Sequence, residues 1–83
     1  MSQGIEPPVP RVLRLSERDN VAVALGTVAA GAQVAGVTAG SRIPRGHKFA
    51  VEPIADGAPV LKFGQIIGFA AGPIAPGAHV HVH

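Results

Sequence analysis

A seven-residue pattern that occurs four times constrains the fold of this chain more than any other feature. In each copy an apolar residue, two variable residues, a glycine, two further residues and a second apolar residue follow one another, and the copies span residues 28–34, 43–49, 54–60 and 74–80. A central glycine suits a tight turn because glycine adopts a positive φ at little cost, and both flanking apolar residues can then point inward. The glycines are 15, 11 and 20 residues apart, which excludes a solenoid of strict period. We therefore expect one irregular β-domain built from similar turns.

The composition limits this domain in size and in autonomy. Glycine and proline contribute 11 and 8 of the 83 residues, so long helices are excluded. The chain has only three phenylalanines as large aromatic residues and no cysteine, so a disulfide cannot support a small core. We expect residues 1–11 to form a flexible leader and residues 12–83 to form one domain that gains stability from a partner, a homo-oligomer being one form of it. A free-standing enzyme with a deep cleft of its own is not expected.

The remaining segments predict short elements between the turns. Residues 12–15 resemble a first strand, and Asp19 is placed to cap a short helix that runs to Leu25 and ends at Gly26. Residues 62–70 resemble a strand interrupted by two glycines, which usually mark a bulge or a close approach of another group. Residues 79–83 alternate strictly between histidine and valine, as a strand does.

Charge and hydropathy exclude two classes of partner. Seven basic residues are scattered against five acidic ones, and the absence of Tyr and Trp argues against nucleic-acid binding. Residues 21–41 and 63–83 carry no Asp, Glu, Lys or Arg, but their glycines and prolines are too many for a membrane-spanning helix. No signal peptide is visible, and the lack of cysteine agrees with a cytoplasmic protein.

Five segments occur in the order seen in one family. These segments are residues 19–25 (DNVAVAL), 43–50 (IPRGHKFA), 60–68 (VLKFGQIIG), 74–77 (IAPG) and 80–83 (VHVH). Together they resemble SAF domains, and more narrowly the N-terminal SAF domain of the altronate and galactarate dehydratases and the small subunit of sulfolactate sulfo-lyase. The resemblance covers roughly residues 12–83, nearly the whole chain.

The resemblance implies a fold, an activity and a partner. The fold would be a mainly β domain of the β-clip type with one or two short helices. The chain would be a small, non-autonomous subunit or N-terminal domain of a hydroxy-acid lyase, inactive alone, which dehydrates altronate or galactarate or eliminates sulfite from sulfolactate. A large dehydratase-type subunit would share with it a divalent metal, iron(II) among the candidates. The alternative is a non-catalytic SAF module for carbohydrate binding or assembly.

The terminal strand supplies the candidate metal ligands. His79, His81 and His83 would share one face of an extended strand, and alternate positions lie about 6.5–7 Å apart, so two imidazoles can converge on one cation. The resemblance favours His81 and His83 over His79. The alternative is an exposed strand whose valines pack inward while its histidines face solvent.

The second glycine turn carries the candidate catalytic residues. An imidazole can act as a general acid or base near neutral pH, and an adjacent lysine and histidine can hold a carboxylate or polarise a hydroxyl. The resemblance of the G-H-K segment to the family therefore makes His47 and Lys48 the candidate catalytic residues. The alternative is a turn histidine bonded to a backbone carbonyl, beside a solvated lysine.

Further polar residues are candidates for binding the substrate, and their specific support is weaker. Arg45, Lys62 and Gln65 would face a sugar-acid carboxylate or the partner subunit. Asp19 and Asn20 belong to the same set, although a helix that Asp19 caps, with Asn20 in its first turn, is the favoured interpretation of these two residues.

Overall fold

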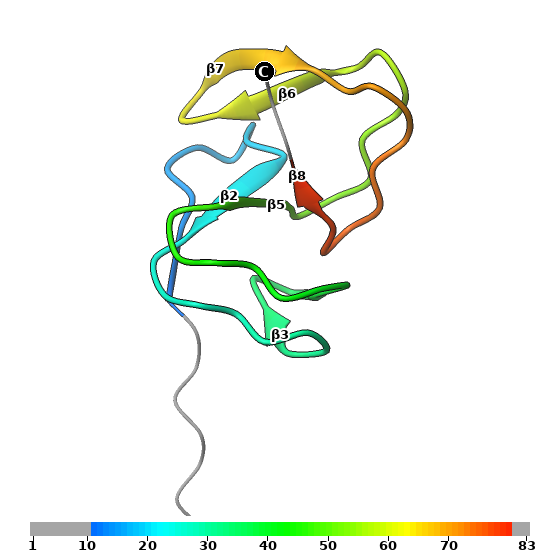
Figure 1. Cartoon of the computed structure of the whole chain (residues 1–83). Helices are drawn as coiled ribbons and strands as arrows, with labels where there is room; N and C mark the ends of the chain where they lie inside the picture. The colour runs from blue at the N-terminus through cyan, green and yellow to red at the C-terminus, as the bar shows by residue number, and fades with distance from the viewer. Residues whose placement is uncertain (1–10, 81–83) are drawn as a thin grey trace, which may run out of the picture.

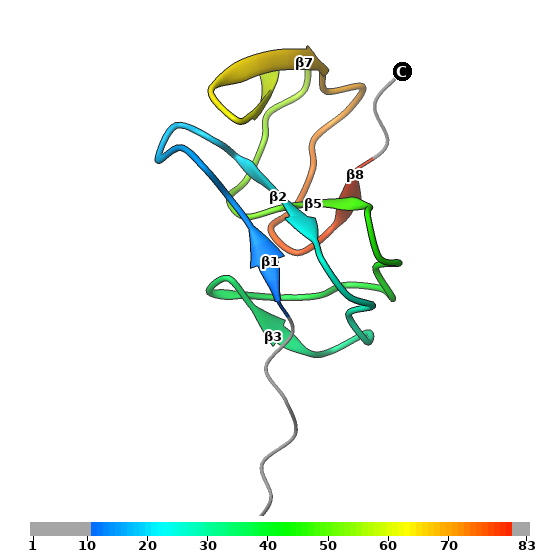
Figure 2. The ribbon, with the colours of Figure 1, turned by 90° about the vertical axis from the view of Figure 1, so that its left-hand side faces the viewer.

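The computed structural model describes residues 11–80, which contain eight short strands joined by turns (Figures 1 and 2). In chain order they are β1 (Val12–Leu13), β2 (Val21–Ala24), β3 (Gln33–Val34), β4 (Val37–Thr38), β5 (Lys48–Ala50), β6 (Pro59–Lys62), β7 (Gln65–Phe69) and β8 (His79–Val80). The expectation of a mainly β domain is confirmed.

The strands form one central sheet and two hairpins. The sheet has the order β1-β2-β5-β8, and every neighbouring pair is antiparallel. The hairpins β3–β4 and β6–β7 lie at opposite ends of the domain, with the central sheet between them (Figure 1). The central sheet therefore links two similar halves.

The four glycine turns form as expected. The central glycines Gly31, Gly46, Gly57 and Gly77 all have φ between 78° and 84°. In each turn the residue after the glycine donates its N–H to the carbonyl three residues earlier, at 2.9–3.0 Å. A positive φ at the third position of a hydrogen-bonded turn defines type II, the geometry for which glycine is preferred.

The turns also bind one another in reciprocal pairs. A buried alanine lies seven residues before each glycine, and these alanines are Ala24, Ala39, Ala50 and Ala70. Each glycine N–H donates to the alanine carbonyl of its partner turn, at 2.7–2.8 Å: Gly31 to Ala39, Gly46 to Ala24, Gly57 to Ala70 and Gly77 to Ala50. Two antiparallel bridges, Val28 to Ile43 and Ile54 to Ile74, complete the pairs. The domain is thus a structural duplication, with one turn pair in each half.

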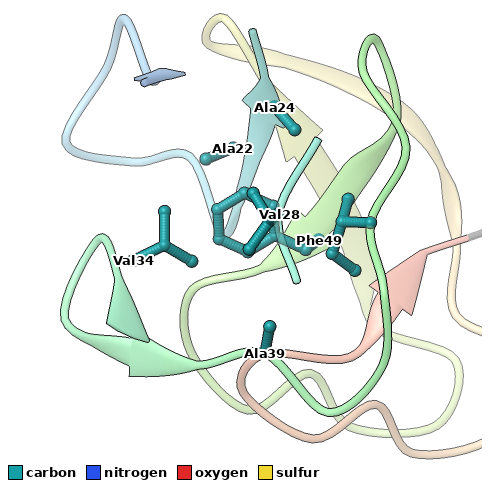
Figure 3. Packing of buried hydrophobic residues seen from close by; sticks show 7 residues of the cluster. Ala22, Ala24, Val28, Val34, Ala39 and Phe49 are labelled. Atoms are coloured by element: carbon teal, nitrogen blue, oxygen red, sulfur yellow. The ribbon is translucent and has the colours of Figure 1, made fainter. Parts of the chain in front are cut away.

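The core follows the same division. Phe49 is fully buried in the first half, and Figure 3 shows the side chains of Ala22, Val28, Val34 and Ala39 around its ring. The second half buries a smaller cluster that consists of Val21, Ala50, Ile54, Val60, Ala70 and Val80. Because β2 and β5 contribute to both clusters, the central sheet holds the two halves together.

Two local predictions were wrong. The expected helix from Asp19 to Leu25 is strand β2, and residues 11–80 contain no helix. The alternation of Val21 and Val23 with alanine fits a strand, and pairing with β1 and β5 overrides the capping signal. Residues 62–70 are not one strand either, because Gly64 lies in the turn between β6 and β7. The expected leader lies, apart from Arg11, outside the described residues.

Candidate functional site

Those predicted site residues that lie within residues 11–80 fall into two groups at opposite ends of β2. His47 lies beside Ala24, whose N–H donates to the His47 carbonyl at 2.9 Å, and Asp19 precedes the strand at its other end. Five residues of extended chain span on the order of 16 Å. The structure therefore does not gather all the predicted residues into one site.

The first group centres on a pair of histidines. Nδ1 of His47 lies 2.8 Å from Nε2 of His79, and the ring centroids are 4.9 Å apart with a tilt of 34°. One of the two nitrogens carries the proton that the other accepts. Since His47 is exposed and His79 is half-buried, the pair is accessible from solvent.

The backbone of both histidines is fixed. The His47 N–H donates to the Pro44 carbonyl at 3.0 Å within the second glycine turn. His79 is the first residue of β8 and lies opposite Phe49 of β5. The pair therefore joins a turn to a strand 32 residues further along the chain.

Lys48 and Arg45 flank this pair differently. Lys48 lies opposite Val80 in the β5–β8 ladder, whereas Phe49 lies opposite His79, so strand alternation places Lys48 and His79 on opposite faces of the sheet. Arg45 is exposed at the second position of the His47 turn. Of the two cations, Arg45 is the one on the same turn as His47.

The second group centres on a buried carboxylate. Asp19 is fully buried, and its oxygens accept the N–H of Gly64 at 2.7 Å, of Phe63 at 2.8 Å and of Ser16 at 3.3 Å. Arg14 closes the loop from outside, with Nε and Nη2 donating to the Asp19 carbonyl at 3.0 and 2.8 Å. Asp19 therefore fastens the loop before β2 to the tip of the β6–β7 hairpin.

The hydrogen bonds decide the charge state of this carboxyl. Burial alone raises the pKa of Asp19, but the backbone N–H groups of Gly64, Phe63 and Ser16 outweigh burial and hold that pKa below its ordinary value of 3.8. Asp19 is thus ionised at neutral pH, and each of its two carboxylate oxygens accepts a backbone N–H from the hairpin tip.

Asn20 connects the same two segments through its side chain. Its Nδ2 donates to the Pro59 carbonyl at 2.9 Å, and its Oδ1 accepts the Leu61 N–H at 2.7 Å. The Asn20 side chain thus bonds one C=O and one N–H of β6, as the backbone of a neighbouring strand would. The contacts of Asp19 and Asn20 are therefore structural. The prediction that Asp19 caps a helix was wrong, because its carboxylate accepts the backbone N–H groups of a hairpin turn instead.

The hairpin tip presents the remaining candidates. Lys62 and Gln65 lie opposite each other at the ends of β6 and β7, on either side of the Phe63–Gly64 turn. The Lys62 ammonium lies 5.1 Å from the centroid of the Phe63 ring, within the range of a cation–π contact. Phe63 has a φ of 55°, a conformation that is rare for a bulky residue. The sequence analysis did not predict that Phe63 is a turn residue of positive φ that contacts Lys62. The adjacent Gly64 was the signal for a tight turn.

The pair of His47 and His79 has some, but not all, of the features of a metal site. Neutral imidazole is a ligand for iron, zinc and related cations, and two imidazole nitrogens converge here. Within residues 11–80, no cluster of three or more His, Cys, Asp or Glu side chains has the arrangement of a metal site. The other two candidate ligands, His81 and His83, lie outside the described residues.

Comparison with known proteins identifies the domain. Residues 10–83 match the family described as the altronate/galactarate dehydratase SAF domain. The chain belongs to this family. The resemblance to the SAF domain of the altronate and galactarate dehydratases is thereby confirmed.

Two longer proteins are similar to the chain. It is 47% identical over 75 residues to a protein of Escherichia coli (strain K12) named altronate dehydratase, and 32% identical over 75 residues to one of Bacillus subtilis (strain 168) with the same name. Each alignment covers 86% of this chain and 15% of the relative. The chain therefore spans about 15% of the length of these relatives. No helix among the described residues is long and apolar enough to cross a membrane.

Proposed function

We propose that this chain is the SAF part of a cytoplasmic enzyme that dehydrates a sugar acid such as altronate or galactarate. The observation that carries the proposal is the 47% identity to the altronate dehydratase of Escherichia coli, which extends over most of this chain. The rest of the enzyme, corresponding to the other 85% of that relative, would be a large partner chain or a fused domain. Elimination of sulfite from sulfolactate is a related lyase reaction that the same module would serve.

The histidine pair is the group of this chain best placed to take part. Dehydration of a hydroxy acid removes the proton on the carbon next to the carboxylate and expels the β-hydroxyl as water, so one group must accept a proton and another must donate one. In the hydrogen-bonded pair one ring nitrogen donates a proton and the other accepts it, so the pair contains both kinds of group. His47, as the more exposed member, is the candidate that reaches the substrate, and Arg45 on the same turn supplies positive charge for its carboxylate. Lys48, on the opposite face of the sheet from His79, does not belong to this arrangement.

A divalent cation belongs to this proposal. Bound at the site, it would polarise the oxygens of the hydroxy acid as a Lewis acid. His79, His81 and His83 are the proposed ligands from this chain, and the partner would complete the set. Lys62 and Gln65, at the other end of β2, face the partner or a remote part of the substrate.

A domain exchange tests the proposal. This chain replaces the matching segment of the Escherichia coli relative, and formation of the dehydrated keto acid from altronate is measured. We expect the chimera to be active, and His47→Ala within it to reduce kcat by about 100-fold or more, the usual effect of losing an acid–base group. Arg42→Ala, at an exposed position outside both groups, is the control and should leave turnover unchanged.

The same experiment separates the alternative function. If the His47→Ala chimera turns over altronate at the rate of the unsubstituted chimera, the pair has no catalytic part. The non-catalytic module for carbohydrate binding or assembly then replaces the proposal.

A further inference from the structure

We propose that the outer face of the β6–β7 hairpin, the face turned away from the core, is the surface through which this domain docks on the rest of the dehydratase. The face consists of Pro59, Leu61, Ile66 and Phe69. The partner surface would be apolar at its centre and would carry an acidic group opposite the hairpin tip. The inference deepens the proposed function and rests on it for the identity of the partner.

The strand register places these four side chains on one side of the hairpin. Val60 is 1% exposed and lies opposite Gly68, so this pair faces the core. Side chains alternate along a strand, and residues that lie opposite each other share a face. The two neighbouring pairs therefore point away from the core: Pro59 with Phe69, and Leu61 with Ile66.

The outer face is apolar and exposed. Phe69 is 66% exposed and Ile66 is 58% exposed, and Pro59 and Leu61 are half-buried. An antiparallel sheet that packs one face on a core ordinarily presents polar side chains on its other face. A hairpin that is apolar on both faces is typical of a sheet that is covered on both sides, which indicates that a partner covers this one.

The equivalent hairpin of the first half shows that the fold does not require an apolar outer face. Strand β3 follows the Gly31 turn as β6 follows the Gly57 turn, so β3–β4 and β6–β7 have the same place in the duplication. In β3–β4 the pair that faces the core is Val34 with Val37, and the outward pair is Gln33 with Thr38, both exposed and polar. The two hairpins thus differ in the face that does not serve the core.

The charge at the hairpin tip limits which partner surface fits. Lys62 is the only charged residue between positions 59 and 69, and it lies at the end of β6 beside the Phe63 ring. Docking therefore buries no charge at the centre of the outer face, and an acidic group opposite Lys62 would complement the tip. Because Asp19 binds the N–H groups of Phe63 and Gly64, the hairpin presents this face in a fixed orientation.

The size of the outer face favours the rest of the enzyme over a second copy of this chain. A stable interface between two separate proteins takes about 800 Å² and roughly 20–30 residues from each partner, and the outer face offers four residues. So small a face suffices where further contacts or a chain connection also hold the partner in place. The relatives contain such a partner, because the segment similar to this chain is 15% of each of them.

Hydrogen exchange of the backbone amides tests the inference in the chimera of this chain with the Escherichia coli relative. Residues 65–69 should exchange at least about tenfold more slowly in the chimera than in the isolated 83-residue chain, because docking excludes water from β7. Residues 33–38, in the equivalent hairpin, should exchange at the same rate in both proteins. This second comparison verifies that the domain is folded in both.

A double substitution assigns the protection to the outer face. Ile66→Ser combined with Phe69→Ser should return the exchange of residues 65–69 in the chimera to the rate of the isolated chain. The matched control, Gln33→Ser combined with Thr38→Ser, changes the outward pair of the equivalent hairpin and should leave the protection intact. All four side chains are exposed, so thermal unfolding of the isolated chain should change little in either variant, which separates loss of docking from loss of folding.

Two results would overturn the inference. One is equal exchange of residues 65–69 in the chimera and in the isolated chain. The other is slow exchange in the isolated chain that depends on its concentration and disappears with the Ile66 and Phe69 substitutions, which would assign the face to a second copy. Exchange is measured without substrate, so an inactive chimera with a protected hairpin contradicts the proposed function alone, and an active chimera with an unprotected hairpin contradicts the docking alone.

Discussion

Asp19 and Gly64, 45 residues apart in the chain, are joined by a 2.7 Å hydrogen bond from the Gly64 N–H to the buried carboxylate. The same carboxylate accepts the Phe63 N–H, so one side chain binds both residues of the turn between β6 and β7. Both turn residues have positive φ, as a two-residue type I′ hairpin requires. A charged acceptor strengthens such bonds, and Asp19 therefore fixes the hairpin tip relative to the central sheet.

This bond predicts a stability that depends on pH. The pKa of Asp19 is below 3.8 in the folded chain, so its contribution is fully present above that value and is lost as the pH falls through the folded pKa. Asp19→Asn should therefore be less stable than the unsubstituted chain at neutral pH, and the difference should shrink in acid. Urea unfolding between about pH 7 and pH 2 measures it.

The control for that series is Glu52→Gln, which removes one negative charge from an exposed position. A gap between the unsubstituted chain and Asp19→Asn that stays constant over the whole pH range would contradict the role given to the charge.

Asn20→Ala should cost about 2–3 kcal/mol of unfolding free energy. The substitution leaves the Leu61 N–H and the Pro59 carbonyl without their partner, and each unsatisfied backbone group costs about 1–3 kcal/mol where water cannot replace it. Asn20→Asp keeps an acceptor for Leu61 but turns a carboxylate oxygen toward the Pro59 carbonyl, so it should also destabilise. Chemical denaturation of both variants checks this, and a cost below about 0.5 kcal/mol for alanine would show that the amide bridge is dispensable.

The four turns were predictable because their requirement is local. Glycine at the third position of a type II turn and an apolar residue three positions away on either side are visible in the sequence. The reciprocal pairing was not predicted, since it joins the glycine of one turn to an alanine of another, such as Gly46 to Ala24. An alanine seven residues before each of the four turn glycines was the available signal, but alanine is common in this chain and one sequence gives no pairing information.

The contacts of the candidate site were predicted less completely than the turns, because they join segments that are distant in the sequence. Local pattern singled out His47 and His79 separately, whereas their contact depends on the pairing of β5 with β8. Asp19 was recognised as a capping residue, but the donors that it binds lie in the tip of a distant hairpin. Residue types indicate what a side chain can bind, and the tertiary fold decides which partner it meets.

Phe63→Gly should be more stable than Phe63→Ala by about 1 kcal/mol, a reversal of the usual order. The residue has a φ of 55°, where any side chain with a Cβ atom is strained by about 1–2 kcal/mol and glycine is not. The larger backbone entropy of glycine offsets part of the gain, by roughly 0.5–1 kcal/mol. Thermal unfolding of the two variants compares them directly, and equal or greater stability of the alanine variant would argue against a left-handed residue at the tip.

Gly77→Ala should destabilise the chain far more than Gly57→Ala. Both glycines have a positive φ, 84° and 78°, so both substitutions carry the left-handed strain of about 1–2 kcal/mol. A Cβ atom on Gly57 meets open space, whereas one on Gly77 would overlap the Thr38 carbonyl, which is backbone and cannot rotate away. The Gly77 carbonyl also accepts the Gly40 N–H at 3.0 Å, so this turn packs directly on the other half of the domain.

Urea unfolding with Gly57→Ala as the matched control checks this difference. We expect a loss near the strain value for Gly57→Ala, and for Gly77→Ala a loss larger by at least about 2 kcal/mol or a chain that does not fold, because the two halves must separate to admit the methyl group. Equal losses for the two variants would contradict the close packing of this turn against Thr38.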